Sequence, residues 1–262
     1  MILAIPYYDP DGRYNACFRQ YKDLLLSTFE AICLSVIAPT ETRNASFLHE
    51  LSETGCTLVQ TAPEGSFGQP SRDALRCAAK DASSISPVFF GFLDRILFAL
   101  DTEWRSSFLA DLHAFQTHDF CVFERSPAAW ATHPSNYREV EQMITQMGHM
   151  LWGLSIEWSP GALLMSPSTV QMVLQSSVSP SFAIWGEWIL LALTHHIGLT
   201  QKSVDWLTWE DPYWEQTDVQ ALKHRRESSQ DETRRRIAWN TPILQLFTEE
   251  RFTRHASYSK GS

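Results

Sequence analysis

The sequence predicts an α/β fold with a doubly wound, mostly parallel sheet and a helical C-terminal extension. Short apolar runs typical of buried strands alternate with segments of helical periodicity along the first half of the 262-residue chain. Turns rich in Pro, Gly and Asp separate these segments, as at 6–12 and 63–70. Strands that alternate with helices form parallel sheets with helices packed on both faces.

The alternation is clearest in the first half of the chain. Phe18, Tyr21 and Leu25 recur at helical spacing and predict a helix with one buried face. Gly55 marks the end of the next helix, because glycine is favoured just after a helix. The strands expected here are 2–6, 31–38, 56–60 and 88–93, and the helices are 14–29, 44–54 and 71–81.

The second half continues with less regular spacing. The sequence Ser-Pro-Ser at 166–168 is typical of a helix start. The segment 217–239 is strongly charged, and we expect a solvated helical element with paired charges. The other elements expected here are helices at 106–115, 137–151 and 185–193 and strands at 120–123 and 162–165.

These elements divide the chain into a main domain and an extension. The main domain is expected over 1–200, with a first half at 1–104 and a second half at 105–200. Residues 201–254 are expected to form a mostly helical extension, followed by a disordered tail at 255–262.

Composition narrows the class of partner. The net charge is −9 and no extended basic block exists outside 223–236, so nucleic acid is not an expected partner. The five cysteines form no Cys-x-x-Cys pair, which argues against a disulfide framework or a structural zinc site. The first residues do not resemble a signal peptide, and the longest apolar stretch, 189–193, is too short to span a bilayer. We therefore expect a cytoplasmic protein without a transmembrane segment.

One apolar run ends in a charged pair. The run from Val88 to Leu93 is followed directly by Asp94 and Arg95. In an open parallel sheet, ligands bind just beyond the carboxyl ends of the strands. A carboxylate placed there can hold a metal ion or the hydroxyl groups of a ligand. Asp94 is therefore the first candidate for a functional residue, although a local surface ion pair with Arg95 would also explain the pattern.

The order of motifs in the first half resembles a known family. The chain shows a strand ending in an acidic turn, a strand ending in Pro-Thr, a Gly-x-x-Gly-x-x-x-Arg-x-Ala-Leu helix start at 65–75, and an apolar strand ending in Asp. This order resembles the nucleotide-sugar-binding half of GT-A-fold glycosyltransferases, and the resemblance covers about residues 1–200. It implies a nucleotide-sugar donor bound across the carboxyl ends of the first four strands.

The resemblance implies where the donor binds. In that fold the loop after the first strand and the loop before the Arg helix embrace the nucleotide, and the strand ending in Asp carries an Asp-x-Asp motif that binds diphosphate through a metal ion. A plain turn would explain Asp9 equally well. The donor-binding residues implied for this chain are Pro6, Tyr8, Asp9, Gly68, Arg72, Asp94 and Arg95.

This chain departs from the family at the metal-binding motif. The Asp-x-Asp positions read Phe92-Leu93-Asp94, so the first acid is missing. A divalent cation, Mg²⁺ or Mn²⁺, remains the expected cofactor, held weakly by Asp94 because phosphate groups can supply other ligands. Arg95 could offset part of the diphosphate charge. Further metal ligands under this hypothesis are His195, His196 and Asp211.

The second half resembles the acceptor side of the same family. The segment Trp-Gly-Glu-Trp at 185–188 is similar to the acidic segment that supplies the base in inverting members, so Glu187 is the expected catalytic base. An acid that only favours a helix N-terminus is the structural alternative. His133 would also fit a structural histidine in a turn. The acceptor side is expected to include Arg125, Thr132, His133 and Gly161.

Three functions follow from these observations. The first is a glycosyltransferase that moves a sugar from a nucleotide-sugar donor to a hydroxyl group of a small-molecule or glycan acceptor. The missing acid at Phe92 favours the alternative, a non-catalytic nucleotide- or sugar-binding protein on a decayed GT-A scaffold. A nucleotidyltransferase shares the doubly wound sheet, but a more basic phosphate loop would be expected there.

Overall fold

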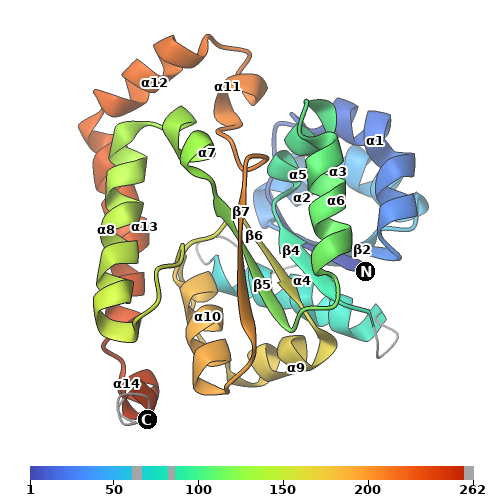
Figure 1. Ribbon diagram of the computed structural model, residues 1–262. Helices are drawn as coiled ribbons and strands as arrows, with labels where there is room; N and C mark the ends of the chain where they lie inside the picture. Colours follow the sequence, from blue (N-terminus) through green and yellow to red (C-terminus); the bar gives the residue numbers. More distant parts are fainter. Residues whose placement is uncertain (61–66, 82–85, 257–262) are drawn as a thin grey trace.

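The computed structural model describes residues 1–60, 67–81 and 86–256, and Figure 1 shows a central sheet with helices on both faces. The strands are β1 (Ile2–Tyr7), β2 (Ala31–Val36), β3 (Thr57–Gln60), β4 (Val88–Gly91), β5 (Phe120–Arg125), β6 (Ala162–Met165) and β7 (Leu199–Val204). They form a seven-stranded sheet in the order β3-β2-β1-β4-β6-β5-β7. Among these strands only β6 runs antiparallel to its neighbours, so the prediction of a mostly parallel sheet is confirmed.

The side chains of each strand enter two cores, one on each face of the sheet. On β1, Leu3 and Ile5 enter one core while Ile2 and Ala4 enter the other, because successive residues of a strand point to opposite faces. The first core is covered by α1 (Asn15–Thr28), α3 (Ala45–Glu53), α5 (Leu93–Asp101) and α6 (Arg105–Phe115), and the second by α4 (Gly68–Asp81), α9 (Pro167–Ser176) and α10 (Ile184–Thr194).

The C-terminal helices pack against the rest of the molecule. The remaining helices are α2 (Ala38–Arg43), α7 (Pro127–Thr132), α8 (Ser135–Trp152), α11 (Asp211–Trp214), α12 (Val219–Glu227), α13 (Gln230–Leu246) and α14 (Glu250–Ala256). α13 lies along α8, and α14 packs against α10 (Figure 1). Ile243, Leu246 and Phe252 join the second core there, together with Trp158.

Two elements differ from the prediction. β4 ends at Gly91 and α5 begins at Leu93, so Asp94 lies in the first turn of a helix instead of directly after a strand. The apolar run concealed this break because Phe92 and Leu93 continue the hydrophobic pattern across it. β7 has no counterpart in the prediction, since its sequence Leu-Thr-Gln-Lys-Ser-Val is largely polar and it forms an edge of the sheet.

The segment boundaries also differ from expectation. β7 pairs with β5, so the expected end of the main domain at residue 200 falls inside a strand of the sheet. α4 begins at Gly68, earlier than expected. Residues 61–66 of the Gly-rich loop and 257–262 of the expected tail lie outside the described residues, whereas 255–256 belong to α14. Within the described part of the chain, no helix combines the length and apolar character that a membrane span requires.

Candidate functional site

An open cleft of about 230 Å³ lies at the carboxyl ends of β1 and β4. Ligands of open α/β sheets bind at this edge. Tyr8 follows β1 and Asp94 comes shortly after β4, so the topology brings a phenol and a carboxylate to one wall. The lining residues are Pro6, Tyr7, Tyr8, Tyr14, Ile37, Phe67, Pro70, Phe92, Leu93 and Asp94.

Asp94 supplies the carboxyl group of this cleft. One of its oxygens accepts a hydrogen bond from the backbone N–H of Arg95 at 2.9 Å. Burial and then the nearby Glu210 carboxylate raise the pKa of Asp94 to about 7, against the opposing effect of Arg95. Burial, followed by the charge of Asp94, also raises the pKa of the Tyr14 phenol in the same wall. Asp94 therefore holds its proton more strongly than an exposed aspartic acid does.

Asp9 supports the loop after β1. Its carboxylate accepts hydrogen bonds from the backbone N–H groups of Arg13 at 2.9 Å and Tyr14 at 3.1 Å. Its own N–H donates to Thr40 Oγ1 at 2.8 Å, and the residue is only 2% exposed. These contacts match the turn that the sequence also allowed. The expected ligand contact of Asp9 is therefore corrected to a structural role, in which it holds the backbone at Tyr14.

Arg95 is paired with a second acid, Glu210. Arg95 Nε lies 3.2 Å from Glu210 Oε1, and a Cβ atom added to Gly161 would lie 2.4 Å from Arg95 Nη1. Gly161 thus allows the backbone to approach the guanidinium. Arg95 Nη1 and Glu210 Oε2 are buried without a hydrogen-bond partner among the described residues. The expected diphosphate contact of Arg95 would compete with this ion pair, which sequence spacing could not reveal.

Gly68 and Arg72 join α4 to the segment before α10. Arg72 Nη1 donates to the Ser179 carbonyl at 2.6 Å, and the Gly68 N–H donates to the Pro180 carbonyl at 3.2 Å. A Cβ atom on Gly68 would lie 2.0 Å from the Ser179 carbonyl oxygen, so packing requires glycine here. Arg72 is 8% exposed, and a guanidinium held in this way is not available to a diphosphate, which corrects its expected role.

Glu187, the expected catalytic base, is 0% exposed and lies in the first turn of α10. Its carboxylate accepts hydrogen bonds from Ser177 Oγ and from the N–H groups of Val178 at 3.0 Å and Ser179 at 3.1 Å. Arg251 Nη2 lies 2.7 Å from the same carboxylate. A general base must come within hydrogen-bond reach of a substrate proton, and this buried, fully engaged carboxylate does not. The catalytic assignment is therefore wrong.

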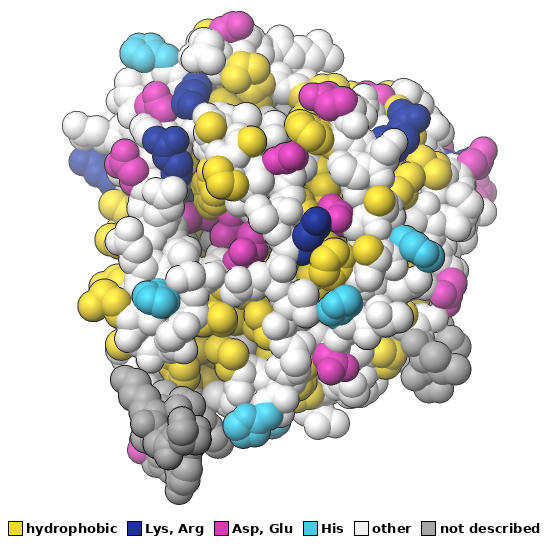
Figure 2. Space-filling view, viewed as in Figure 1, with side chains coloured by type: hydrophobic (Ala, Val, Ile, Leu, Met, Phe, Trp, Pro, Cys, Tyr) yellow, Lys and Arg dark blue, Asp and Glu magenta, His cyan; other side chains and the backbone are white. Residues whose placement is uncertain are grey.

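Arg125, at the end of β5, lies in a network of acids. It is 7% exposed, and its Nη1 lies 3.1 Å from a Glu141 oxygen and 3.0 Å from a Glu157 oxygen. Its guanidinium is 4.4 Å from the ring centroid of Trp130. Burial raises the pKa of Glu157 to about 8, although Arg125 opposes the shift. Glu124 and Glu157 line a cavity of about 170 Å³, the acidic hollow, at this end of β5. Figure 2 shows acidic side chains in a hollow of the face that it draws.

Thr132 and His133 have structural contacts. Thr132 Oγ1 accepts a hydrogen bond from the Trp209 N–H at 2.9 Å, which holds the segment that carries Glu210. His133 Nδ1 lies 2.9 Å from the Ala129 carbonyl oxygen. The histidine is 3% exposed, and burial lowers its pKa well below the usual value. The expected acceptor contact of His133 is therefore corrected to the turn histidine that the sequence also allowed.

The proposed metal ligands do not come together. His195 and His196 precede β7, which runs in the same direction as β4, so they lie at the opposite edge of the sheet from Asp94. Asp211 does lie close enough to Asp94 to contribute to its raised pKa. Over the described ranges, no group of three or more His, Cys, Asp or Glu side chains could hold a metal ion. Since Mg²⁺ and Mn²⁺ need several oxygen ligands, these residues do not fit a metal site built by the protein alone.

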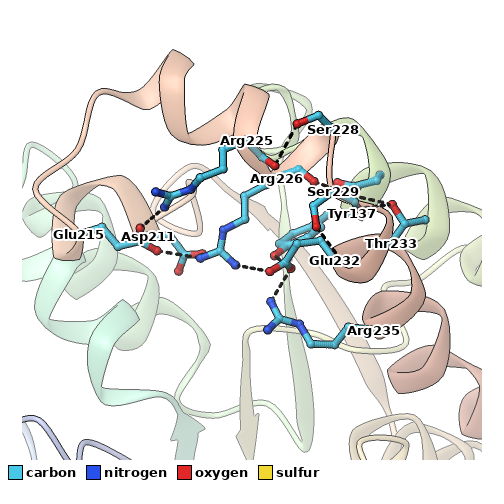
Figure 3. Close-up of polar contacts among 11 residues, drawn as sticks. Tyr137, Asp211, Glu215, Arg225, Arg226, Ser228, Ser229, Glu232, Thr233 and Arg235 are labelled. Atoms are coloured by element: carbon cyan, nitrogen blue, oxygen red, sulfur yellow. Dashed lines mark hydrogen bonds and ion pairs between the residues drawn. The ribbon is translucent and has the colours of Figure 1, made fainter.

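The charged segment 217–239 contains a network that sequence spacing did not reveal. Arg226 lies 3.4 Å from Asp211, 2.7 Å from Glu215 and 2.9 Å from Glu232. Figure 3 shows the guanidinium between these three acids, which come from α11, the turn after it and α13. Charge spacing in a sequence indicates ion pairs within one helix, whereas these ion pairs join residues of different helices and turns. Because Asp211 is paired with Arg226 in this network, its carboxylate is not a free metal ligand.

Comparison with known proteins supports the fold. No family model and no curated protein matches the chain. A crystal structure of glucosyl-3-phosphoglycerate synthase from Mycobacterium tuberculosis, in complex with Mn²⁺, uridine diphosphate and phosphoglyceric acid, aligns with a TM-score of 0.52 at 10% identity. The alignment covers 94% of this chain and 77% of that chain. This chain has a GT-A-like fold.

A second solved structure covers nearly the whole of both chains. The 4-diphosphocytidyl-2C-methyl-D-erythritol synthase from Anaerococcus prevotii aligns over 93% of this chain and 96% of that chain, with a TM-score of 0.46 at 8% identity. At 10% identity, the likeness to the glucosyl-3-phosphoglycerate synthase establishes the fold alone, so the function has to be argued from the residues of the site.

Proposed function

We propose that this protein is a transferase that binds a nucleotide sugar in the cleft between Tyr8 and Asp94 and moves the sugar to a hydroxyl acceptor. The observation that carries the proposal is the position of this cleft at the carboxyl ends of β1 and β4 in a GT-A-like sheet. The similar synthase was crystallised with uridine diphosphate and Mn²⁺, which supports a nucleotide ligand on this fold.

The cleft offers a surface for a nucleobase and a carboxylate for hydroxyl groups. Tyr8 is 54% exposed, so its ring is available to stack on a base. Pro6 and Ile37 supply apolar wall next to it. Asp94 would accept hydrogen bonds from hydroxyl groups of the ribose or the sugar, most strongly in its ionised form. The cleft also lies at the start of α5, where the helix dipole favours an anion such as diphosphate.

A divalent cation at this cleft would have to be held mainly by the donor. The described side chains near Asp94 do not form a metal site by themselves, and Arg95 already balances Glu210. Experiments with and without Mn²⁺ therefore decide whether the donor brings a cation with it.

The alternative is a protein that binds a nucleotide sugar without transferring it. The feature that favours it is Phe92, which stands where the first acid of the Asp-x-Asp motif would be. Its ring packs edge-on against Trp185 with 5.3 Å between ring centroids, so the position is filled by aromatic packing. Binding without turnover would support this alternative.

A ligand screen tests the proposal. Thermal unfolding is measured with the diphosphates and sugar conjugates of uridine, guanosine, cytidine, adenosine and thymidine, each with and without Mn²⁺. A ligand at a hundred times its dissociation constant stabilises the fold by about 2.7 kcal/mol, which gives a clear shift. The variant Asp94→Asn should lose much of the shift. Asp231→Asn, in which a carboxylate 91% exposed is removed, is the matched control.

Turnover is measured with the best ligand of the screen. A transferase should hydrolyse its donor slowly even without an acceptor, and release of the nucleoside diphosphate reports this reaction. Release that depends on Asp94 supports the transferase. Absence of any stabilising nucleotide in the screen would contradict the proposal.

A further inference from the structure

We propose that Glu187 is a positioning residue that fixes one wall of the donor cleft through a chain of contacts ending at the start of α4. The inference rests on the proposed function, because the consequence is expressed in donor affinity. It assigns Glu187 a role different from the catalytic one expected from the sequence. The contacts run from Arg251 through Glu187 and the segment 177–180 to α4.

The first link is between Glu187 and the segment that precedes α10. Two backbone N–H groups in succession, those of Val178 and Ser179, point at one carboxylate oxygen at 3.0 and 3.1 Å. Ser177 Oγ donates to the other oxygen and itself accepts from Trp188 Nε1 at 3.0 Å. A carboxylate that accepts several hydrogen bonds holds a loop more strongly than a neutral group does.

The second link joins this segment to α4. The N–H of Ser179 donates to Glu187, and the carbonyl of the same residue accepts a hydrogen bond from Arg72 Nη1 at 2.6 Å. The next carbonyl, that of Pro180, accepts from the Gly68 N–H at 3.2 Å. The close approach at Gly68 leaves no room for a side chain, so the two backbones are locked together. A shift of residues 177–180 must therefore move the start of α4.

The third link is between the start of α4 and the cleft. Phe67 precedes Gly68 and Pro70 follows it closely, and both line the cleft. Phe67 packs edge-on against Phe182 with 5.3 Å between ring centroids and against Trp185 with 6.5 Å. Both of these partners follow the segment that Glu187 orders or belong to its own helix, while a third, Trp239 of α13, packs on Phe67 with 5.9 Å between ring centroids. This wall therefore depends in part on Glu187.

The last link ties the C-terminal helix to the same point. Arg251, on α14, lies 2.7 Å from Glu187 and supplies the positive charge that a buried carboxylate needs. Arg251 is also paired with Glu249. Loss of this arginine would leave Glu187 buried with its hydrogen bonds and with Arg72 as the remaining nearby positive charge. The position of α14 is therefore coupled to the cleft through this ion pair as well as through its packing on α10.

Glu187→Gln tests the inference, because glutamine keeps the size of the side chain while replacing one accepting oxygen by an amide that cannot accept. Donor affinity should fall about tenfold, the effect of losing one charge-assisted hydrogen bond, with kcat nearly unchanged. A catalytic base would show the opposite split, a fall in kcat of roughly 10²–10⁴ with affinity unchanged. The opposite split would overturn the inference.

Hydrogen exchange of the ligand-free protein provides a second measurement that does not depend on nucleotide binding. In Glu187→Gln the backbone amides of 67–75 should exchange faster than in the wild type. The matched control is Glu50→Gln, which breaks the ion pair with Arg19 on the opposite face of the sheet and should leave 67–75 unchanged. Unchanged exchange at 67–75 in folded Glu187→Gln would overturn the inference.

The variant Arg251→Gln keeps the test decisive if Glu187→Gln does not fold. It removes the ion pair between Arg251 and Glu187 but leaves the hydrogen bonds of Glu187. The faster amide exchange at 67–75 and the loss of donor affinity should therefore both appear, but be smaller than in Glu187→Gln. A wild type that binds none of the nucleotides would refute the proposed function, whereas the exchange measurements would still judge the positioning role. Arg251→Gln indistinguishable from wild type in exchange would contradict it.

Discussion

The two ends of the sheet's carboxyl edge use acidic residues in different ways. At β1 and β4 a carboxylate, Asp94, lines an open cleft beside the exposed ring of Tyr8. At β5 two acids, Glu141 and Glu157, pair with Nη1 of the buried Arg125. The comparison teaches that acidic residues can line an open cleft in one place and form buried ion pairs in another, according to whether their partners lie within the chain.

The largest expected effect breaks the β5 side of this comparison. Arg125→Met should lower the free energy of unfolding by about 3 kcal/mol, because a buried acid pair loses its countercharge. The value lies at the low end of the range for such changes, since the raised pKa of Glu157 means that this acid already favours its neutral form in the fold. Urea denaturation measures the loss, and Arg234→Met, at a side chain 73% exposed, is the control. A loss no greater than that of the control would show that the network does not hold the fold.

The next effect sharpens the β4 side. Asp94→Asn should weaken donor binding about tenfold or more, because a hydrogen bond to a charged group contributes roughly 1.5–3 kcal/mol. The free energy of unfolding should not fall at pH 8 and should rise, since the raised pKa of Asp94 means that folding disfavours its ionised form. Calorimetry and denaturation together separate the two quantities. If Asp94→Asn lost stability but kept its donor affinity, the role of Asp94 would be structural, like that of Glu141 and Glu157.

The pH dependence of the two regions should differ in kind. Donor affinity should rise with pH until Asp94 is ionised, above about 7, and this dependence should vanish in Asp94→Asn. Glu157 retains its proton in the fold up to about pH 8, while the unfolded chain has lost it, so Glu157 makes stability fall as pH rises from about 4.5 to 8. Glu157→Gln should flatten that fall without changing the pH profile of donor binding. The comparison would be refuted if Glu157→Gln changed the pH profile of donor binding while Asp94→Asn flattened the fall in stability.

A smaller effect is expected at the exposed ring. Tyr8→Ala should weaken nucleotide binding about fivefold, since stacking of a base on an aromatic ring contributes roughly 1 kcal/mol or more. Tyr8→Phe keeps the ring and should bind nearly as well as the wild type. Equal losses in both variants would point to the hydroxyl group instead of the stacking surface.

The fold was predictable because burial leaves a local mark on the sequence. The strands at 2–7, 31–36 and 162–165 are short apolar runs, and their positions follow from composition alone. β7 could not be predicted because an edge strand needs few apolar residues. The start of α5 could not be predicted because Leu93 continues the apolar run of β4. Local pattern therefore predicts buried elements better than edges and junctions.

The site was predictable only in part, for a physical reason. The topology rule places residues after β1 and β4 together, which brought Tyr8 and Asp94 to one cleft. Whether a polar side chain is free or engaged depends on partners far away in the sequence. Glu187 meets Arg251 across 64 residues, and Arg125 meets Glu157 across 32. No spacing rule links such pairs, so buried ion pairs were mistaken for a catalytic base and an acceptor contact.

Hydrogen exchange with and without the best-binding nucleoside diphosphate tests the central claim most directly, because it locates the ligand on the chain. The account predicts that protection appears at the ends of β1 and β4 and at the start of α4, around Tyr8, Phe67 and Asp94, and is lost in Asp94→Asn. Protection confined to the β5 end, around Arg125 and Trp130, would contradict it and assign the ligand to the acidic hollow.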